Sequence, residues 1–341
     1  MTLETRTDEA AGMENDTLAA ARAGDERAFA ALTLPLHSEL HVHCYRMLGS
    51  LDDADDALQE TLLRAWRQIA HFEPRAPLRA WLYRIATNVC LTALARRARR
   101  SEVFAADVEE DAVRLTPYPD RLLDESGSDW AGPEAVIEQR ESVELAFVAA
   151  VQLLPPRQRA TLLLRDVIGY PAAEVATMLV SSVASVNSAL QRARTTLERE
   201  RSAGRVTRSH TWAGTAFERA LVRRLTDAWH AADVPAIVAL LTEDAVFSMP
   251  PQPDRYVGRA AIGAFLASVP AGGRLDRYRL VATRANRQPA LATYRRDGDT
   301  GVFRAHGMLV LALQGEAIAS MVGFVNPALF AAFDLPAAIE G

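Results

Sequence analysis

Apolar residues recur about every three to four positions along the first hundred residues, which predicts consecutive amphipathic helices. The segment DDADDALQETLLRAWRQIA places Leu58, Leu62 and Trp66 on one face and crowds acidic residues into the first turn, where the helix dipole favours them. A further helix is expected over 77–100, and it ends in the basic sequence ARRARR. We therefore predict an all-α domain over residues 14–101.

Residues 102–133 break this pattern, because they mix acidic residues with proline and glycine and show no sustained period. This composition predicts a linker, although TPYPDRLL inside it has aromatic and apolar groups that can dock onto a neighbouring part of the chain. Helical periodicity resumes over 134–203, with short helices expected at 157–167, 171–179 and 182–199. Three helices with short turns in about 45 residues predict a helix-turn-helix unit.

From residue 212 to 341 the pattern changes again. Helices are expected at 217–231, 234–241 and 259–268, and strand-like runs follow them: AVFSM, RYRLVATRA, PALATYRR, VFRAHGMLVLAL and AIASMVGFV. Helices followed by strands predict an α+β domain with a curved antiparallel sheet. The expected fold is multidomain, with two all-α modules and a C-terminal α+β domain.

Composition narrows the class of protein. The 341 residues carry a net charge of −5, and all 38 basic residues are arginine, so a wholly basic nucleic-acid coat is excluded but a local basic patch is not. No run of about 18 uncharged apolar residues occurs, so we expect no membrane span. The acidic, polar first residues do not resemble a secretory signal, and two cysteines cannot form a disulfide framework. These features favour a cytoplasmic location.

The predicted recognition helix over 182–199 combines an apolar seam with an exposed polar face. The seam is expected to contain Val183, Val186, Leu190, Ala193 and Leu197. The residues expected to contact DNA are Ser185, Asn187, Ser188, Gln191, Arg192 and Arg194. Asn and Gln can pair bidentately with adenine, and Arg with guanine or phosphate. The alternative from the pattern alone is a helical bundle with ordinary surface charges.

Two other groups of residues have side chains typical of binding sites. Aromatic residues around 66–81 resemble base-stacking platforms, but Trp66 and Trp81 fall on apolar faces and are expected in the core. His37, His41 and Cys44 share one helical face, yet a single helix supplies neither a fourth ligand nor a closing loop. We therefore expect no metal site and no cofactor.

The order of "DADDALQETLLRAW", "WLYRIATN" and "LPPRQRATLLLRDVIGYPAAEVA…VNSALQRARTTL" resembles the bacterial sigma-70 family, and more closely its extracytoplasmic-function (ECF) RNA polymerase sigma factors. The resemblance covers about residues 14–202. The later segments "LTEDAVFSMPPQPDRYVGRAAIGAFL" and "GFVNPALFAAFDLP" look like the subgroup with a fused SnoaL-like domain, a polyketide-cyclase-like cone fold. The family implies binding to core RNA polymerase and promoter-specific initiation of transcription.

The resemblance also implies roles for individual residues. Four residues match the family's helix that binds the clamp helices of the largest polymerase subunit: Asp53, Asp56, Gln59 and Glu60. Five residues match the part of the family's fold that opens and reads the minus-ten element: Phe72, Arg75, Asn88, Arg96 and Arg97. The recognition helix matches the minus-35 reader, so the DNA contacts named above would lie at that element. The acids can equally serve as helix caps.

Four positions depart from the family pattern. Thr92 stands where many relatives have Asp, and Asn187 and Ala189 replace basic residues, so the promoter sequence read is expected to differ. Val180 occupies the turn position usually held by Gly. Because a β-branched residue disfavours positive φ, this turn is expected to adopt another geometry.

The C-terminal domain offers polar groups for a small-molecule pocket. The candidates are His230, Tyr256, Tyr278, Tyr294 and His306. Strand register decides which of them point inward, and a shared fold does not transfer chemistry, so we expect a regulatory or ligand-sensing role and no enzyme activity. The alternative is a DNA-binding regulator fused to a ligand-binding or isomerase/cyclase-like enzyme domain.

Overall fold

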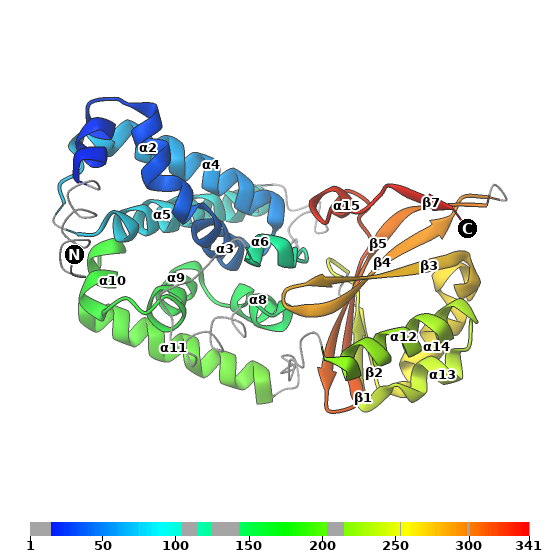
Figure 1. Cartoon of the computed structure of the whole chain (residues 1–341). Coiled ribbons are helices and arrows are strands. Elements are labelled where there is room, and N and C mark those ends of the chain that lie inside the picture. Colours follow the sequence, from blue (N-terminus) through cyan, green and yellow to red (C-terminus); the bar gives the residue numbers. More distant parts are fainter. Residues whose placement is uncertain are drawn as a thin grey trace, which may run out of the picture. The chain divides into compact units, whose positions relative to one another are not determined.

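The structure, a computed structural model, describes residues 15–74, 76–103, 115–124, 143–202, 215–252, 254–298 and 301–340. The chain divides into two compact units (Figure 1). Of the described residues, the helical unit contains those within 15–103 and 151–196 together with 123–124, and the C-terminal unit contains the others.

The first half of the helical unit has the predicted helices. They are α2 (Glu26–Thr33), α3 (His37–Leu48), α4 (Leu51–Gln68) and α5 (Leu78–Val103). Gly49, in the left-handed conformation with φ 79°, ends α3, and Ser50 caps α4 by accepting a hydrogen bond from the Asp53 amide. Trp66 and Trp81 pack against a buried cluster with Ile69 and Phe72, as expected for core residues.

The second half of the helical unit contains the helix-turn-helix. Its elements are α8 (Leu145–Gln152), which starts in the C-terminal unit, α9 (Pro156–Leu162), a π-helical turn (Leu163–Val167), α10 (Ala172–Met178) and α11 (Val183–Ser202). Helices α10 and α11 are bent by 99° at the turn between them. The expected seam is present at Val186, Leu190 and Ala193, whereas Val183 is exposed.

The geometry expected for the turn before α11 was wrong. Val180 has φ 48°, in the left-handed region, although it is β-branched. The Ser181 amide donates to the Ala176 carbonyl and the Val180 amide to that of Thr177, which is the Schellman pattern that ends α10. The two hydrogen bonds hold Val180 in a conformation that its side chain disfavours.

A buried arginine joins the two halves of the helical unit. Arg159 of α9 is 4% exposed, and it donates to the main-chain carbonyls of Met47, Gln152 and Leu154 and to the Gln152 carboxamide. The Gln152 carboxamide in turn donates to the Arg46 carbonyl over 3.0 Å. Burial, and next the charge of Arg97, lower the pKa of Arg159 to about 10, so the guanidinium stays charged near neutral pH.

The C-terminal unit is built on a mixed sheet, and its longer helices lie on one face of that sheet (Figure 1). The helices are α6 (Asp120–Asp124, of which 123–124 belong to the helical unit), α12 (Ala216–His230), α13 (Val234–Ala239), α14 (Arg259–Ser268) and α15 (Leu329–Ala332). The strands are β1 (Leu241–Ser248), β2 (Arg255–Val257), β3 (Tyr278–Ala285), β4 (Gln288–Arg296), β5 (Val302–Gln314), β6 (Ala317–Phe324) and β7 (Ala338–Glu340). Their order is β2-β1-β6-β5-β4-β3, and β7 also pairs with β5.

The expectation of a wholly antiparallel sheet was wrong at one pair. Strand β1 runs parallel to β6, whereas the other pairs are antiparallel. Because β1 and β6 are distant in the chain, their pairing is a crossover that local sequence patterns do not encode.

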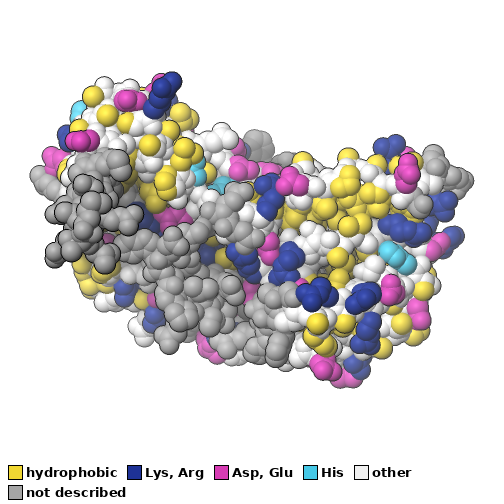
Figure 2. Space-filling view, in the orientation of Figure 1, with side chains coloured by type: hydrophobic (Ala, Val, Ile, Leu, Met, Phe, Trp, Pro, Cys, Tyr) yellow, Lys and Arg dark blue, Asp and Glu magenta, His cyan; other side chains and the backbone are white. Residues whose placement is uncertain are grey.

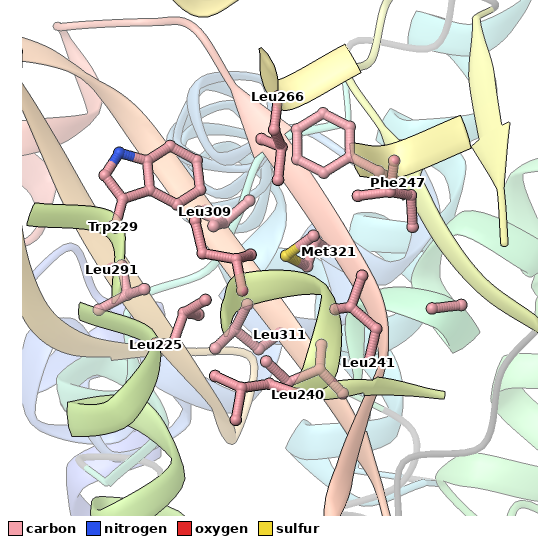
Figure 3. Close-up of a cluster of buried hydrophobic side chains, with 14 of the residues drawn as sticks. Leu225, Trp229, Leu240, Leu241, Phe247, Leu266, Leu291, Leu309, Leu311 and Met321 are labelled. Carbon is pink, nitrogen blue, oxygen red and sulfur yellow. The ribbon is translucent and has the colours of Figure 1, made fainter. Parts of the chain in front are cut away.

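Hydrophobic side chains fill the space between the helices and the sheet (Figure 3). Leu225 and Trp229 of α12 pack with Leu291, Leu309 and Leu311 of the strands, and Figure 3 shows these groups pointing toward one another. A smaller cluster contains Ala292, Tyr294, Phe303 and Phe330. Side chains alternate between the faces of a strand, so Leu291 and Tyr294 lie on opposite faces of the sheet.

Candidate functional site

Helix α4 presents an acidic, exposed face. Asp56 and Gln59 are exposed, while Ala54, Ala57 and Thr61 on the other side are buried. Asp53 accepts from Arg97 over 2.5 Å, and Glu60 from Arg64 over 2.6 Å, so these two carboxylates already have partners in the chain. The structure therefore brings the four predicted polymerase-binding residues to one side of α4.

The predicted minus-ten residues differ in their exposure to solvent. Asn88 and Arg96 are exposed on α5, and Arg97 is paired with Asp53. Phe72 is 5% exposed and packs against Trp81 with ring centroids 4.9 Å apart, so in this conformation its ring cannot stack on a base.

One minus-ten residue cannot be placed, and sequence reasoning missed another candidate. Arg75 lies outside the described residues. Arg84 is exposed one helical turn before Asn88, on the same face of α5, and the spacing of four positions was the signal that would have found it.

The predicted minus-35 residues share the outer surface of α11. Ser185, Asn187, Ser188, Gln191 and Arg192 are all exposed. Arg194 is also exposed but forms a two-pronged hydrogen-bonded pair with Asp166, at 2.9 and 2.8 Å, which raises its pKa. Arg194 thus braces α11, and the other five side chains remain as the face that can enter a groove.

The candidate pocket residues do not all lie on one face of the sheet. His230 Nε2 accepts from the Leu280 amide over 3.0 Å at the edge of β3, and burial followed by the nearby Arg279 charge lowers its pKa. Tyr278 and His306 lie against each other with ring centroids 5.4 Å apart. This histidine's pKa is lowered by burial and next by Arg295.

The other two candidates lie elsewhere in the C-terminal unit. Tyr256 stacks on Phe265 with centroids 4.3 Å apart. Tyr294 is fully buried against Phe330, in the cluster on the opposite face of the sheet from Leu291, and burial raises its pKa. On the face seen in Figure 2, arginines of this unit are interspersed with acidic and hydrophobic side chains, unlike a continuous DNA-binding surface.

The histidines of α3 and the two cysteines, Cys44 of α3 and Cys90 of α5, serve the packing of the helical unit. His41 pairs with Asp55 over 3.0 Å, and His43 Nε2 contacts Thr87 Oγ1 over 2.9 Å. A hydrogen bond to Cys44, and next burial, raise the pKa of the Cys90 thiol. In the part of the chain that the structure describes, no three His, Cys, Asp or Glu side chains are grouped to hold a metal ion.

Over the described ranges, no single helix is long and apolar enough to cross a membrane. Helices α10 and α11 have sufficient length and apolar character only when taken together, and the chain bends sharply between them. The chain has two helical modules, one of which contains a helix-turn-helix, and a domain built on a mixed sheet. This combination is typical of a multidomain DNA-binding protein. Comparisons with known families assign its parts. Residues 34–100 match Sigma-70 region 2, residues 144–197 match Sigma-70, region 4, and residues 222–321 match the SnoaL-like domain.

Individual relatives extend this result to most of the chain. It is 42% identical over 327 residues to the ECF RNA polymerase sigma factor SigG of Mycobacterium tuberculosis, covering 92% of this chain and 85% of that protein. It is 30% identical over 183 residues to the RNA polymerase sigma-H factor of Pseudomonas aeruginosa, covering 52% of this chain and 87% of the relative. The crystal structure of the M. tuberculosis extracytoplasmic function sigma factor SigJ shares the fold, with a TM-score of 0.60, 22% identity and coverage of 92% of this chain and 100% of that one.

The chain belongs to the ECF RNA polymerase sigma factors and carries a SnoaL-like C-terminal domain. The fold class and the family expected from the sequence are thereby confirmed. The exact domain boundaries and the roles of individual residues stay predictions.

Proposed function

We propose that this sigma factor binds the clamp helices of the largest subunit of core RNA polymerase through the acidic face of α4. The observation that carries the proposal is the exposure of Asp56 and Gln59 on a helix whose opposite side is buried in the core. Exposed carboxylates on a rigid helix steer and orient a basic partner surface. Asp53 and Glu60 border the same face and would contribute once their pairs with arginine open.

The test reverses charge on this face in the full-length chain. D56R/E60R should weaken association with core polymerase by at least tenfold, because attraction becomes repulsion. E316R/E340R makes the same charge change at exposed positions of the C-terminal unit and should leave association unchanged. Equal affinity of both variants and the unaltered protein, with circular dichroism intact, would refute the assignment of α4.

Two further exposed surfaces of the helical unit, on α5 and α11, would bind DNA. The outer side of α5, with Asn88, Arg96 and the neighbouring Arg84, would contact the minus-ten element, and α11 would read the minus-35 element in the major groove. Promoter binding should be weak for the free chain of net charge −5 and strong with core polymerase. A run-off transcription assay over genomic fragments tests promoter-specific initiation directly.

The C-terminal domain would act as a regulator in cis rather than as an enzyme. Its described residues form a large interior cluster of aliphatic and aromatic side chains. Tyr278 lies against His306, whereas Tyr294 lies in the cluster on the opposite face of the sheet. The five candidates therefore do not share one pocket, as a set of groups acting on one substrate would. Truncation after about Arg208 should change promoter-specific transcription at equal polymerase saturation; identical activity would refute the regulatory role.

A further inference from the structure

The tip of the β3–β4 hairpin, residues Ala285–Gln288, binds a segment of the linker. The Asn286 amide donates to the Tyr118 carbonyl over 2.8 Å, and Pro119 pairs with Ala285 as an antiparallel bridge. Tyr118 is fully buried. The docking expected for TPYPDRLL thus occurs within the C-terminal unit, by addition of main chain to the edge of the sheet.

The side chains of the hairpin tip hold the linker at Tyr118 and the chain at the start of α8, at Val143 and Leu145. Asn286 Oδ1 accepts from the Tyr118 amide over 2.8 Å, and its Nδ2 donates to the Val143 carbonyl over 2.8 Å. Gln288 Oε1 accepts from the Leu145 amide over 2.9 Å. Both carboxamides are buried, at 0% and 2% exposure, and burial of such groups is favourable only with partners of this kind.

A charge cluster adds to the docking. Arg284 at the end of β3 pairs with Asp120 of the linker and with Glu218 of α12, whose carboxylates are 10% and 7% exposed. Asp120 also accepts from the Arg287 amide over 2.7 Å. Neutralising Arg284 would leave two carboxylates close together in a poorly solvated place, so these contacts support a single docked arrangement.

We propose that the hairpin tip is a receptor for the linker and shortens the free tether between the two sigma modules. Helix α5 ends at Val103 and α8 begins at Leu145, so residues 104–144 connect them. Fully extended, this chain spans about 140 Å. With Tyr118 and Val143 held at one tip, the path from α5 to the tip consists of residues 104–117, whose fully extended length is about 50 Å.

The tether matters when the modules separate on a promoter, a consequence that rests on the proposed function. Elements at minus-ten and minus-35 are about 85 Å apart along B-form DNA. The extended length of the undocked linker exceeds this separation. The extended length of the docked linker is smaller than the separation, so the modules themselves would have to span the remaining distance. The C-terminal domain would therefore determine which spacings between the two elements the factor accepts.

The receptor is tested first in the free full-length protein by amide hydrogen exchange. Asn286 has φ 56°, so Gly is the replacement that removes the carboxamide without backbone strain. N286G should accelerate exchange at Tyr118 and Leu145 by about 5- to 100-fold. N286D keeps the acceptor for the Tyr118 amide but opposes the Val143 carbonyl, so it should release Val143 more than Tyr118. R304A, which breaks an exposed pair with Asp297 in the same sheet, is the control.

The tether is tested by transcription with core polymerase from promoters whose spacer is varied by a few base pairs. The unaltered protein should have a narrow optimum, and N286G should broaden it. Inserting ten Gly/Ser residues between positions 106 and 107 lengthens the tether without touching the receptor, and it should broaden the optimum equally. Unchanged exchange in N286G overturns the receptor, and identical spacer profiles of all three proteins overturn the tether. Absence of promoter-dependent transcription from every protein would instead refute the proposed function.

Discussion

Replacing Val180 by Gly should stabilise the helix-turn-helix. A left-handed conformation costs an L-residue about 1–2 kcal/mol, and Val180 adopts φ 48°. Its side chain is 86% exposed, so little buried apolar area is lost on replacement. The greater freedom of Gly in the unfolded chain offsets about 0.4–1 kcal/mol of the gain. The expected net gain is about 0.5–1 kcal/mol.

Native-state hydrogen exchange is the suitable assay, because a chain with several units need not unfold in one step. The amides of Leu179 and Val186, bonded to Val175 and Ser182, report opening on either side of the turn. V180G should slow their exchange about 2- to 5-fold. S181G, at the neighbouring position, has no left-handed strain to relieve and should accelerate it. Faster exchange in both variants would refute the strain argument.

Three further predictions concern single side chains. Burial, and next the charge of Arg46, lower the pKa of His43 to about 3, whereas a His in the unfolded chain has a pKa near 6.5. The free energy of unfolding should therefore fall as the pH drops from 6.5 toward 3, by up to about 1.4 kcal/mol per pH unit. In denaturation measured at a series of acidic pH values, H43Q should flatten this slope. R159M should loosen α9 by about 3 kcal/mol, seen as faster amide exchange in that helix, and unchanged exchange would contradict its bridging role. Q191A should cost about 1–3 kcal/mol of holoenzyme–promoter affinity; an equal loss on every minus-35 sequence would assign the side chain to phosphate.

The sequence predicted those features that depend on local pattern. The helix over 259–268 and the start of α4 after Gly49 were predicted correctly, because periodicity and capping depend on residues that are close together in the sequence. The exposed face of α11 followed from the same periodicity. The family followed from two motifs in the right order.

Features that depend on distant contacts were not predictable in this way. Phe72 sits in a loop sequence typical of exposure, yet tertiary packing buries it against Trp81. Tyr278 and Tyr294 were grouped in one pocket, but their side chains face opposite sides of the sheet, which only the register of β3 and β4 decides. For Val180, the hydrogen bonds that close α10 outweigh the intrinsic preference of the side chain.

Arg159 gives the contact between the two sigma modules an unusual response to solution conditions. Its partners are carbonyl oxygens near the C-terminal ends of α3 and α8 and one carboxamide, so they neither accept a proton near physiological pH nor attract a neutralising counterion as a carboxylate does. Added salt screens exposed pairs such as Arg194–Asp166 far more than it weakens such a buried contact. Raising the ionic strength should thus detach the factor from DNA before it separates the modules.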